Sequence, residues 1–548
     1  MRYSRETHQT WLGVLVILAC IAQLPACAGS QSSSSTQPPP VRATSYFLDC
    51  SSTASGNGTQ ASPWDSLSNA NAFAFLPGDS LLLKRGTTCS GSLTPQGSGK
   101  NGAPIVIDAY GTGASPTIDA GMNEEGIRLV DQQYWEIGNL EIVGGDLFGV
   151  FVSAAPAQAV LNHLYFRNLD LHGAHHTSVA HGDSGELFVN VVGTTLLNDV
   201  LVDGISAHDS QVSDGIEVIS GFSTLPSNGS VTLGTNVTIQ NSTSHNIYGY
   251  GILVMQVEHS LIQNNVVHDT GLCPNCPGPG SATVGIACVT CRLAVMQSNE
   301  SYANQTHLPY DGGSFGLEDA RDSIVQYNYG HDSMGYCIGH FAGAGQSVNN
   351  VIRYNVCSNN GQKDLLSYQG ELVLNGESPR GPYDSLQIYN NTFYWNPAGA
   401  GPVISAGSGR YSGSNQSFFK NNIIYSAGPD MIHATSGLAL DNNIFWTTSG
   451  NTPVWQIDGN TYAGFSTYQT STGQDSHSFY LDPMMLNPTY HEVGKPTTAF
   501  TLLPGSPAIG TGANVCQGIA NCSMGTQDLW GNPLPSGSGY SIGANQPQ

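Results

Sequence analysis

The stretch Tyr310 to His340, YDGGSFGLEDARDSIVQYNYGHDSMGYCIGH, decides the fold because it holds one complete period of a repeated pattern. A polar loop over residues 310–314 leads into a short alternating strand at 316–318, and a second strand follows at 324–326. An asparagine corner at Asn328 separates this strand from a third short segment. Short strands bounded by turn residues at a fixed period predict one rung, meaning one complete turn, of a right-handed parallel β-helix.

The asparagine corner recurs along the chain, each time after a short run of β-branched or aromatic residues. The corner positions are Asn168, Asp203, Asn241, Asn265, Asn299, Asn328, Asn355, Asn391, Asn422 and Asn443. Their spacings lie between roughly 20 and 37 residues, the range of solenoid repeats. Asparagine suits such a corner because its side chain tolerates left-handed backbone geometry and can hydrogen-bond to the next corner. We therefore expect one long all-β domain, a solenoid with almost no helix, rather than several globules.

The composition and charge of the chain limit its partners. Charged residues make up only 10% of the sequence, Gly is abundant at 66 residues, and the formal net charge is −23. Phosphate binding needs a basic stripe, which 16 Lys and Arg residues do not supply, so nucleic acid is not expected as a partner. A strongly anionic polysaccharide would need a cation to bridge it to the protein.

The N-terminus has the parts of a bacterial export signal. Arg2 and Arg5 precede the apolar run Trp11–Ile21, which is too short to span a bilayer comfortably. The following Leu24-Pro25-Ala26-Cys27 resembles a lipoprotein box, which would make Cys27 a lipidated N-terminus, and plain cleavage with secretion is the alternative. We expect an extracytoplasmic monomer, either an outer-membrane or cell-surface lipoprotein or a secreted protein, with no membrane contact beyond the lipid.

Five segments are predicted along the chain. They are a signal peptide with a lipoprotein-like box at 1–27, a Ser/Pro-rich tether at 28–43, an N-terminal cap with the first rungs at 44–125, the parallel β-helix at 126–450, and a C-terminal β-rich closing segment at 451–548.

Cysteines of an exported protein are expected to form disulfides. The predicted pairs are Cys50 with Cys89, Cys337 with Cys357, and Cys516 with Cys522. Four others have the spacing C-x2-C-x11-C-x2-C, which resembles a zinc ribbon: Cys273, Cys276, Cys288 and Cys291. The export signal favours disulfides over zinc for these four residues as well.

Motifs at both ends of the chain resemble those of a known superfamily. Residues 46–119 contain, in order, Pro77-Gly78-Asp79 before an apolar strand, Arg85-Gly86, and Ala109-Tyr110-Gly111 before Pro116. They resemble the entry segment of right-handed parallel β-helix proteins of the pectate-lyase-like superfamily. The later motifs resemble its closing segment, which would cover the open last rung: Ser506-Pro507-Ala508-Ile509, Asp528 with Gly531, and Ile542-Gly543-Ala544.

The resemblance covers nearly the whole mature chain and implies a carbohydrate-active protein. It leaves the family open, because fold does not determine function. We expect an enzyme that binds a polysaccharide or oligosaccharide in the groove of the β-helix, either a glycoside hydrolase or a polysaccharide lyase. A non-catalytic glycan-binding protein or adhesin on the cell surface is the alternative.

Strand phase selects the candidate catalytic residues. Aligning residues 214–218, 250–253, 284–287 and 315–318 buries Ile216, Ile252, Ile286 and Leu317. Glu217 and Glu318 then point outward on one face, three rungs apart. At ~4.8 Å per strand their separation is about 14 Å, whereas a glycosidase pair needs roughly 5 to 9.5 Å.

Glu318 has nearer candidates for a catalytic partner. Asp311 lies in the loop of its own rung, and His331-Asp332 is expected at the entry to the next rung. Crowded carboxylates raise at least one pKa, which supplies a general acid. We therefore assign catalysis to Glu318, Asp311, Asp332 and His331. A stabilising polar ladder is the alternative for His331, because histidine recurs in phase at His172, His208, His245 and His268.

A lyase would need further groups, since it must neutralise a uronate and remove a proton. Ca²⁺ is the candidate cofactor, held by Asp311, Glu318, Asp319 and Asp332. The candidate bases are Arg353, Lys363, Tyr336 and His331. We predict substrate contacts from Asp214, Glu217, Asp319, Arg353, Lys363, Tyr250 and Tyr336. Tyr248 and Tyr310 are further candidates for stacking on sugar rings, with filling of the turns as the alternative role.

Overall fold

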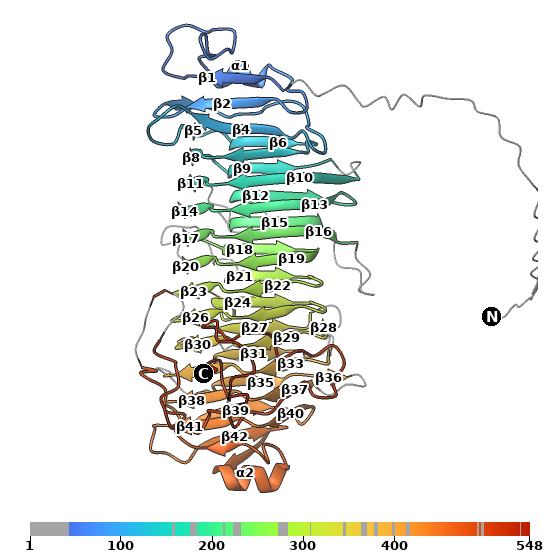
Figure 1. Ribbon diagram of the computed structural model, residues 1–548, viewed down its shortest axis with the longest axis vertical. Helices are drawn as coiled ribbons and strands as arrows, with labels where there is room; N and C mark the ends of the chain where they lie inside the picture. The colour runs from blue at the N-terminus through green and yellow to red at the C-terminus, as the bar shows by residue number, and fades with distance from the viewer. Residues whose placement is uncertain are drawn as a thin grey trace, which may run out of the picture. The chain divides into compact units, whose positions relative to one another are not determined.

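The computed structural model describes residues 43–548 apart from 156–158, 176–183, 212–213, 223–231, 272–282, 307, 344–346, 363–369, 377–381, 397–400, 413–416, 490–492, 495–497 and 538. The predicted signal peptide, Cys27 and nearly all of the tether lie outside these residues. The described chain is a right-handed parallel β-helix, as predicted, in which each rung adds one strand to each of three long sheets (Figure 1).

The first sheet contains 14 strands in parallel order. They are β1 (Ser45–Leu48), β2 (Ser80–Lys84), β4 (Ile105–Tyr110), β7 (Trp135–Gly138), β10 (Val160–Arg167), β13 (Leu196–Asp203), β16 (Gly234–Gln240), β19 (Val257–Gln263), β22 (Val295–Gln297), β25 (Ile324–Gln326), β29 (Val351–Arg353), β33 (Gln387–Tyr389), β37 (Ser417–Lys420) and β40 (Leu438–Asp441).

The second sheet follows the asparagine corner and also contains 14 strands. They are β3 (Thr88–Ser90), β5 (Thr117–Gly121), β8 (Glu141–Gly144), β11 (Asp170–His172), β14 (Ser206–Ser210), β17 (Thr243–Ile247), β20 (Val266–Thr270), β23 (Glu300–Tyr302), β26 (Tyr329–His331), β30 (Val356–Ser358), β34 (Thr392–Trp395), β38 (Ile423–Ser426), β41 (Ile444–Thr447) and β44 (Phe479–Tyr480).

The third sheet contains 13 strands, of which only the last pair, β42 with β43, is antiparallel. They are β6 (Glu125–Val130), β9 (Phe148–Ser153), β12 (Gly185–Val192), β15 (Asp214–Phe222), β18 (Tyr250–Met255), β21 (Val284–Val289), β24 (Gly313–Glu318), β27 (Ile338–Phe341), β31 (Leu372–Asn375), β35 (Ile404–Ser408), β39 (Asp430–Ala434), β42 (Val454–Ile457) and β43 (Asn460–Ala463). A small sheet joins β28 (Ser347–Val348), β32 (Tyr383–Asp384) and β36 (Tyr411–Ser412), and the described residues form two short helices, α1 (Leu67–Asn71) and α2 (Phe465–Thr472).

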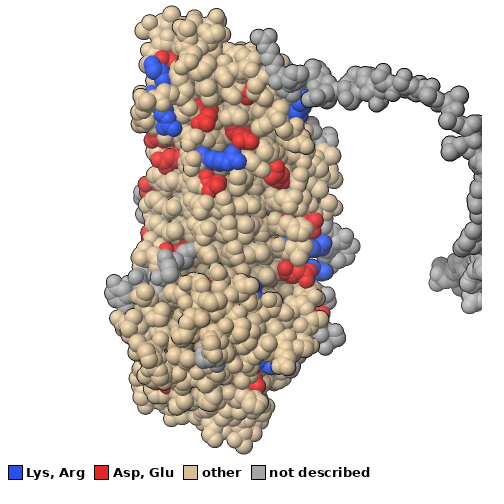
Figure 2. Space-filling model, in the orientation of Figure 1, with Lys and Arg blue, Asp and Glu red and all other residues tan. Residues whose placement is uncertain are grey.

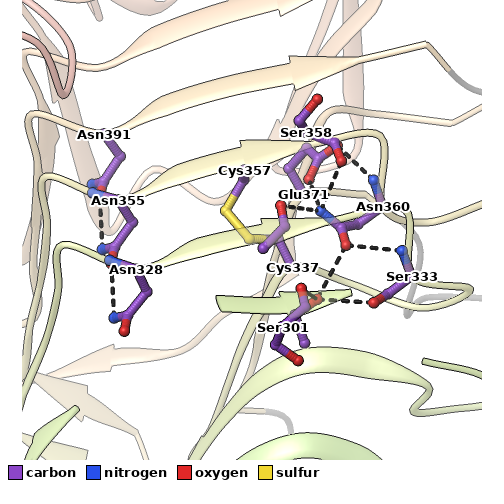
Figure 3. The surroundings of a disulfide bond; sticks show 12 residues. Ser301, Asn328, Ser333, Cys337, Asn355, Cys357, Ser358, Asn360, Glu371 and Asn391 are labelled. Atoms are coloured by element: carbon purple, nitrogen blue, oxygen red, sulfur yellow. Dashed lines mark hydrogen bonds between the residues drawn. A yellow bond between two sulfur atoms is a disulfide. The ribbon is translucent and has the colours of Figure 1, made fainter. Parts of the chain in front are cut away.

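A ladder of buried asparagines fixes the corner between the first and second sheets. The backbone N–H and the Nδ2 of Asn328 both donate to Asn355 Oδ1 at 3.0 Å, and Asn355 bonds in the same way to Asn391 (Figure 3). The predicted bond from corner to corner is thus confirmed. The ladder residues are Asn265, Asn299, Asn328, Asn355, Asn391, Asn422 and Asn443, all with no exposed surface.

The left-handed geometry expected of the ladder asparagines belongs to the residue before them. Tyr327 and Tyr354 have φ of 57° and 52°, and each precedes a ladder asparagine. Asn168 and Asn241 occupy this left-handed position rather than the ladder position, with φ of 51° and 52°. Sequence alone merges the two positions, because asparagine suits both for different reasons: local backbone geometry in one and amide hydrogen bonds in the other.

The strand register corrects one alignment. Ile216, Ile252 and Ile286 pair in sequence, but the next residue in this row is Phe315, not Leu317. Phe315 and Leu317 are both buried in the core. A shift of two residues preserves the alternation of inward and outward side chains, so a pattern of period two does not detect it.

Four disulfides link cysteines of the described chain, and the three predicted pairs are among them. The fourth joins Cys288 to Cys291, as expected for disulfides rather than zinc. Cys273 and Cys276 lie outside the described residues. Cys337–Cys357 crosses the interior between β27 and β30, beside the buried Glu371 (Figure 3).

After α2 the chain folds back along the lower rungs (Figure 1). Tyr389 Oη donates to the Ser523 carbonyl at 2.6 Å, and Gly494 N–H donates to Glu300 Oε1 at 2.7 Å. The last rung is covered by β43 and α2, where Tyr468 stacks on Trp455 at 5.0 Å between ring centroids. The motifs between Ser506 and Ala544 thus do not cover the last rung as expected, whereas β43 and α2, near the start of the predicted closing segment 451–548, cover it and satisfy its open edge.

Candidate active site on the outer face of the third sheet

A pocket of about 330 Å³ lies on the outer face of the third sheet, around β18, β21, β24 and β27. It contains two acidic groups, three tyrosines and a set of apolar side chains. The lining residues are Tyr250, Val284, Ala287, Val289, Tyr310, Asp311, Gly316, Leu317, Glu318, Tyr336 and Phe341.

Small residues in register form the floor of this pocket. Ala287, Gly316 and Gly339 follow one another in one outward row of neighbouring strands. A Cβ at Gly339 would lie 2.5 Å from the Tyr336 ring, and a Cβ at Gly313 would lie 2.2 Å from it. The glycines therefore leave the room in which the ring of Tyr336 packs against the sheet.

Glu318 occupies the next outward row, between Val289 on β21 and Phe341 on β27. Its orientation follows from strand alternation, since the adjacent Leu317 is 2% exposed and packs in the core. A Cβ at residue 343 would lie 2.8 Å from Glu318 Oε1. The absence of a side chain at Gly343 thus keeps one approach to this carboxylate open.

Asp311 enters the same pocket from the loop before β24. It adopts left-handed geometry with φ of 62°, which aspartate tolerates better than most residues. Tyr336 Oη donates to Asp311 Oδ1 at 3.3 Å. The Tyr336 side chain has no exposed surface, so this hydroxyl is fixed relative to the carboxylate.

The pKa values of two tyrosines reflect the negative charge of the site. Burial raises the pKa of Tyr336 well above its ordinary value, and Asp311, Tyr250 and Glu318 raise it further. Burial also raises the pKa of Tyr250, with added effects of Asp311, Asp214 and Glu318. Both phenols remain neutral hydrogen-bond donors near two carboxylates, so Asp311 and Glu318 act on the same small volume.

His331 and Asp332 are not in this pocket. His331 lies on β26 of the second sheet, where its Nδ1 is 2.8 Å from Asp332 Oδ2 and its Nε2 is 3.2 Å from Glu300 Oε1. Burial lowers the pKa of His331, but the bonds with Asp332 and Glu300 outweigh burial and raise it overall. Its ring stacks on Tyr302 at 4.7 Å, which is the polar ladder considered as the alternative.

The predicted substrate contacts are only partly brought together. Tyr250 and Tyr336 line the pocket, while Asp214 and Glu217 are fully buried on β15, with Asp214 accepting from Tyr250 N–H at 3.0 Å. Arg353 lies on the first sheet, where its Nε donates to Gln326 Oε1 at 2.8 Å beneath the C-terminal segment. Lys363 lies outside the described residues, and Tyr248 is buried away from the lining set.

The residues expected to hold Ca²⁺ do not form one donor set. Asp332 is on the second sheet, and Asp319 Oδ1 accepts from Gly343 N–H at 2.6 Å. Asp311 and Glu318 are the carboxylates that the described lining provides, whereas Ca²⁺ takes six to eight oxygen ligands. The described residues therefore do not fit a calcium site, and no step is assigned to this ion.

The sequence alone does not identify three residues of the site: Val289, Phe341 and Gly343. Val289 and Phe341 flank Glu318 in register, and the sequence signal that could have identified them is the outward phase of apolar residues on their strands. Gly343 carries no local signal, because its importance comes from a contact with a neighbouring strand.

Comparisons with known proteins agree on the fold. No family model and no curated protein matches the chain. Among solved structures, a GH136 lacto-N-biosidase from Eubacterium ramulus matches 67% of this chain and 66% of its own chain, with 20% identity and a TM-score of 0.53. Its native form matches with 19% identity and a TM-score of 0.50, covering 68% of this chain and 67% of that one.

Pectate lyase Pel9A matches over 92% of this chain and 96% of its own, with 14% identity and a TM-score of 0.40. The chain spans about two thirds of the length of the lacto-N-biosidase structure. At these identities the likeness shows the fold alone, a parallel β-helix, and assigns no family.

Proposed function

We propose that this protein is an extracytoplasmic glycoside hydrolase that cleaves an uncharged glycan in the pocket of the third sheet. The observation that carries the proposal is the pair Asp311 and Glu318 in one pocket with three tyrosines. The fold likeness to a lacto-N-biosidase supports a carbohydrate-active role. Disulfides support an oxidising compartment.

We assign the proton donor to Glu318. Its neighbours in register are Val289 and Phe341, so apolar side chains flank the carboxyl group that would donate the proton. A protonated Glu318 would protonate the glycosidic oxygen, so that the leaving sugar departs as a neutral alcohol. The pocket supplies apolar and aromatic surface against which a sugar ring can pack.

We assign the stabilising carboxylate to Asp311. The Tyr336 hydroxyl donates to it, and a hydrogen bond to the charged form favours that form. A fixed carboxylate stabilises the positive charge that develops at the anomeric carbon as the bond breaks. A water molecule then forms the new C–O bond at that carbon, and its proton returns to Glu318. Tyr336 is thus a positioning residue for Asp311.

The lining favours hydrolysis over elimination. A lyase neutralises the carboxylate of a uronate with a cation and needs a base. The described lining residues include no Lys, Arg or His, and the raised pKa of Tyr336 opposes its use as a base. The charged Asp311 in such a pocket would also repel a uronate, so an uncharged sugar fits better.

Replacement of the proton donor tests the proposal. Glu318→Gln should lower kcat on natural glycosidic bonds by about 10²- to 10⁴-fold, the usual contribution of general acid catalysis. An aryl glycoside whose leaving group needs no protonation should lose much less, because the proton is then dispensable. The melting temperature should stay at the parent value, since the side chain lies outside the core.

Glu258→Gln is the matched control, because this carboxylate lies on the first sheet near Arg292, and its activity should equal that of the parent. Products are followed by reducing ends and by ultraviolet absorbance. Unsaturated products that absorb in the ultraviolet would show a lyase and contradict the proposal. Glycan binding by the parent without turnover on a neutral panel would show a binding protein.

A further inference from the structure

Aromatic rings form a stacked column on the outer face of the second sheet. Neighbouring ring centroids are 5.0 Å apart from His172 to His208 and 4.7 Å apart from Tyr302 to His331. The column runs through His172, His208, His245, His268, Tyr302 and His331. It lies on a different sheet from the pocket around Glu318.

Two carboxylates stand beside the N-terminal end of this column. Glu141 on β8 pairs in register with Asp170 on β11, and His172 on β11 pairs with His208 on β14. The four side chains thus occupy two adjacent outward rows on three neighbouring strands. Figure 2 shows charged side chains over these N-terminal and central rungs and few over the C-terminal segment.

Potential metal donors from these residues converge. His172 Nε2 lies 3.2 Å from Glu141 Oε1, and His208 Nε2 lies 2.9 Å from Asp170 Oδ1. One ligand atom from each of Glu141, Asp170 and His172 lies within 4.8 Å of the others. Small side-chain rotations would bring such atoms to about 2.0–2.2 Å from one ion, as zinc requires.

Neighbouring groups hold two of the donors from outside the cluster. Thr117 Oγ1 donates to Glu141 Oε2 at 2.6 Å, which leaves Glu141 Oε1 directed at His172. Asp209 Oδ2 lies 2.9 Å from His208 Nδ1, so the other ring nitrogen faces Asp170. A carboxylate behind the remote nitrogen of a histidine is the arrangement that orients metal-binding imidazoles.

We propose that Glu141, Asp170 and His172, with His208 beside Asp170, form a binding site for a divalent transition-metal ion of the Zn²⁺ class. Imidazole nitrogens combined with carboxylate oxygens select such ions over Ca²⁺ and Mg²⁺, which prefer oxygen ligands alone. Within the described chain, Glu141 forms an ion pair with His172 and Asp170 forms one with His208. A divalent cation would compensate both carboxylates at once.

Zinc titration of variants tests this site. Untagged, metal-free protein should bind one equivalent of Zn²⁺ at its tightest site, measured by calorimetry, and excess Ca²⁺ should not displace it. Asp170→Asn and His172→Ala should each weaken this binding at least tenfold, because each removes one donor. Asp170→Asn keeps the shape of the side chain, and melting curves confirm that both variants are folded.

His477→Ala is the matched control, because His477 Nδ1 also lies 2.8 Å from a carboxylate oxygen, that of Asp441, on an exposed surface. It should leave the tight site unchanged. Unchanged zinc affinity in Asp170→Asn and His172→Ala would overturn the proposal. Equal weakening by His477→Ala, or displacement of zinc by Ca²⁺, would overturn it as well.

Discussion

At the scale of single residues, Glu186 shows how burial couples stability to pH. This carboxyl has no exposed surface, and burial raises its pKa from 4.5 to about 7, against the lowering effects of Ser210 and the Ala174 N–H. The folded state thus holds a proton that the unfolded state releases above pH 4.5. Stability is therefore greatest below this value and falls as the pH rises toward 7.

Glu186→Gln should remove this loss of stability at higher pH, because glutamine does not ionise. We expect the variant to be more stable than the parent at pH 8, on the order of 2–3 kcal/mol from the size of the shift, and equally stable near pH 4.5. Chemical unfolding at both pH values measures the difference. Glu124→Gln, at a side chain that is 58% exposed, is the control and should show no such dependence. A gain of the same size at both pH values would contradict the titration.

At the scale of elements, the asparagine ladder carries a stability prediction. Asn328 Oδ1 accepts from the backbone N–H and Nδ2 of Asn299, and Asn328 Nδ2 donates to the Met296 carbonyl. Asn328→Ala would leave these buried groups without partners, at about 1–3 kcal/mol each. We expect a loss of several kcal/mol in unfolding experiments, partly restored by Asn328→Ser, since Ser242 holds this position three rungs earlier. Exposed Asn451→Ala should change little, and an equal loss there would contradict a role for the ladder.

The same scale shows what the sequence can and cannot predict. The asparagines predict the corners, and strand alternation predicts that Leu317 points inward and Glu318 outward, as the structure confirms. The alternation does not count residues, so Leu317 was set opposite Ile286 where Phe315 stands. His331 follows Glu318 by 13 residues, yet two corners and strand β25 lie between them, so His331 lies on the second sheet. Nearness along the chain thus anticipates that Asp311 lies in the pocket of Glu318, but it does not anticipate that His331 lies on the second sheet.

At the scale of the whole molecule, the N-terminal cysteine carries the prediction about location. We propose a lipid anchor on Cys27, based on the Leu24-Pro25-Ala26-Cys27 motif and the Ser/Pro-rich tether after it. No helix within the described ranges is long and apolar enough to span a membrane. Cys27→Ser should move the protein from the membrane fraction to the soluble fraction, followed by immunoblotting of fractionated cells. Cys20→Ser is the control, and unchanged fractionation of Cys27→Ser would favour plain secretion.

The C-terminal segment has a consequence for the order in which the protein assembles. Arg353 and Tyr389 bond to the Ser523 carbonyl, which lies 170 and 134 residues later in the chain. A chain made or exported from its N-terminus can stack these rungs as soon as they emerge, because each rung contacts its neighbours. The outer faces of these rungs then stay exposed until the C-terminal residues have been synthesised or exported. During that interval the tyrosines of the first sheet are exposed to other nascent chains, so the end of translation, and not the stacking of rungs, closes the period of greatest risk of aggregation.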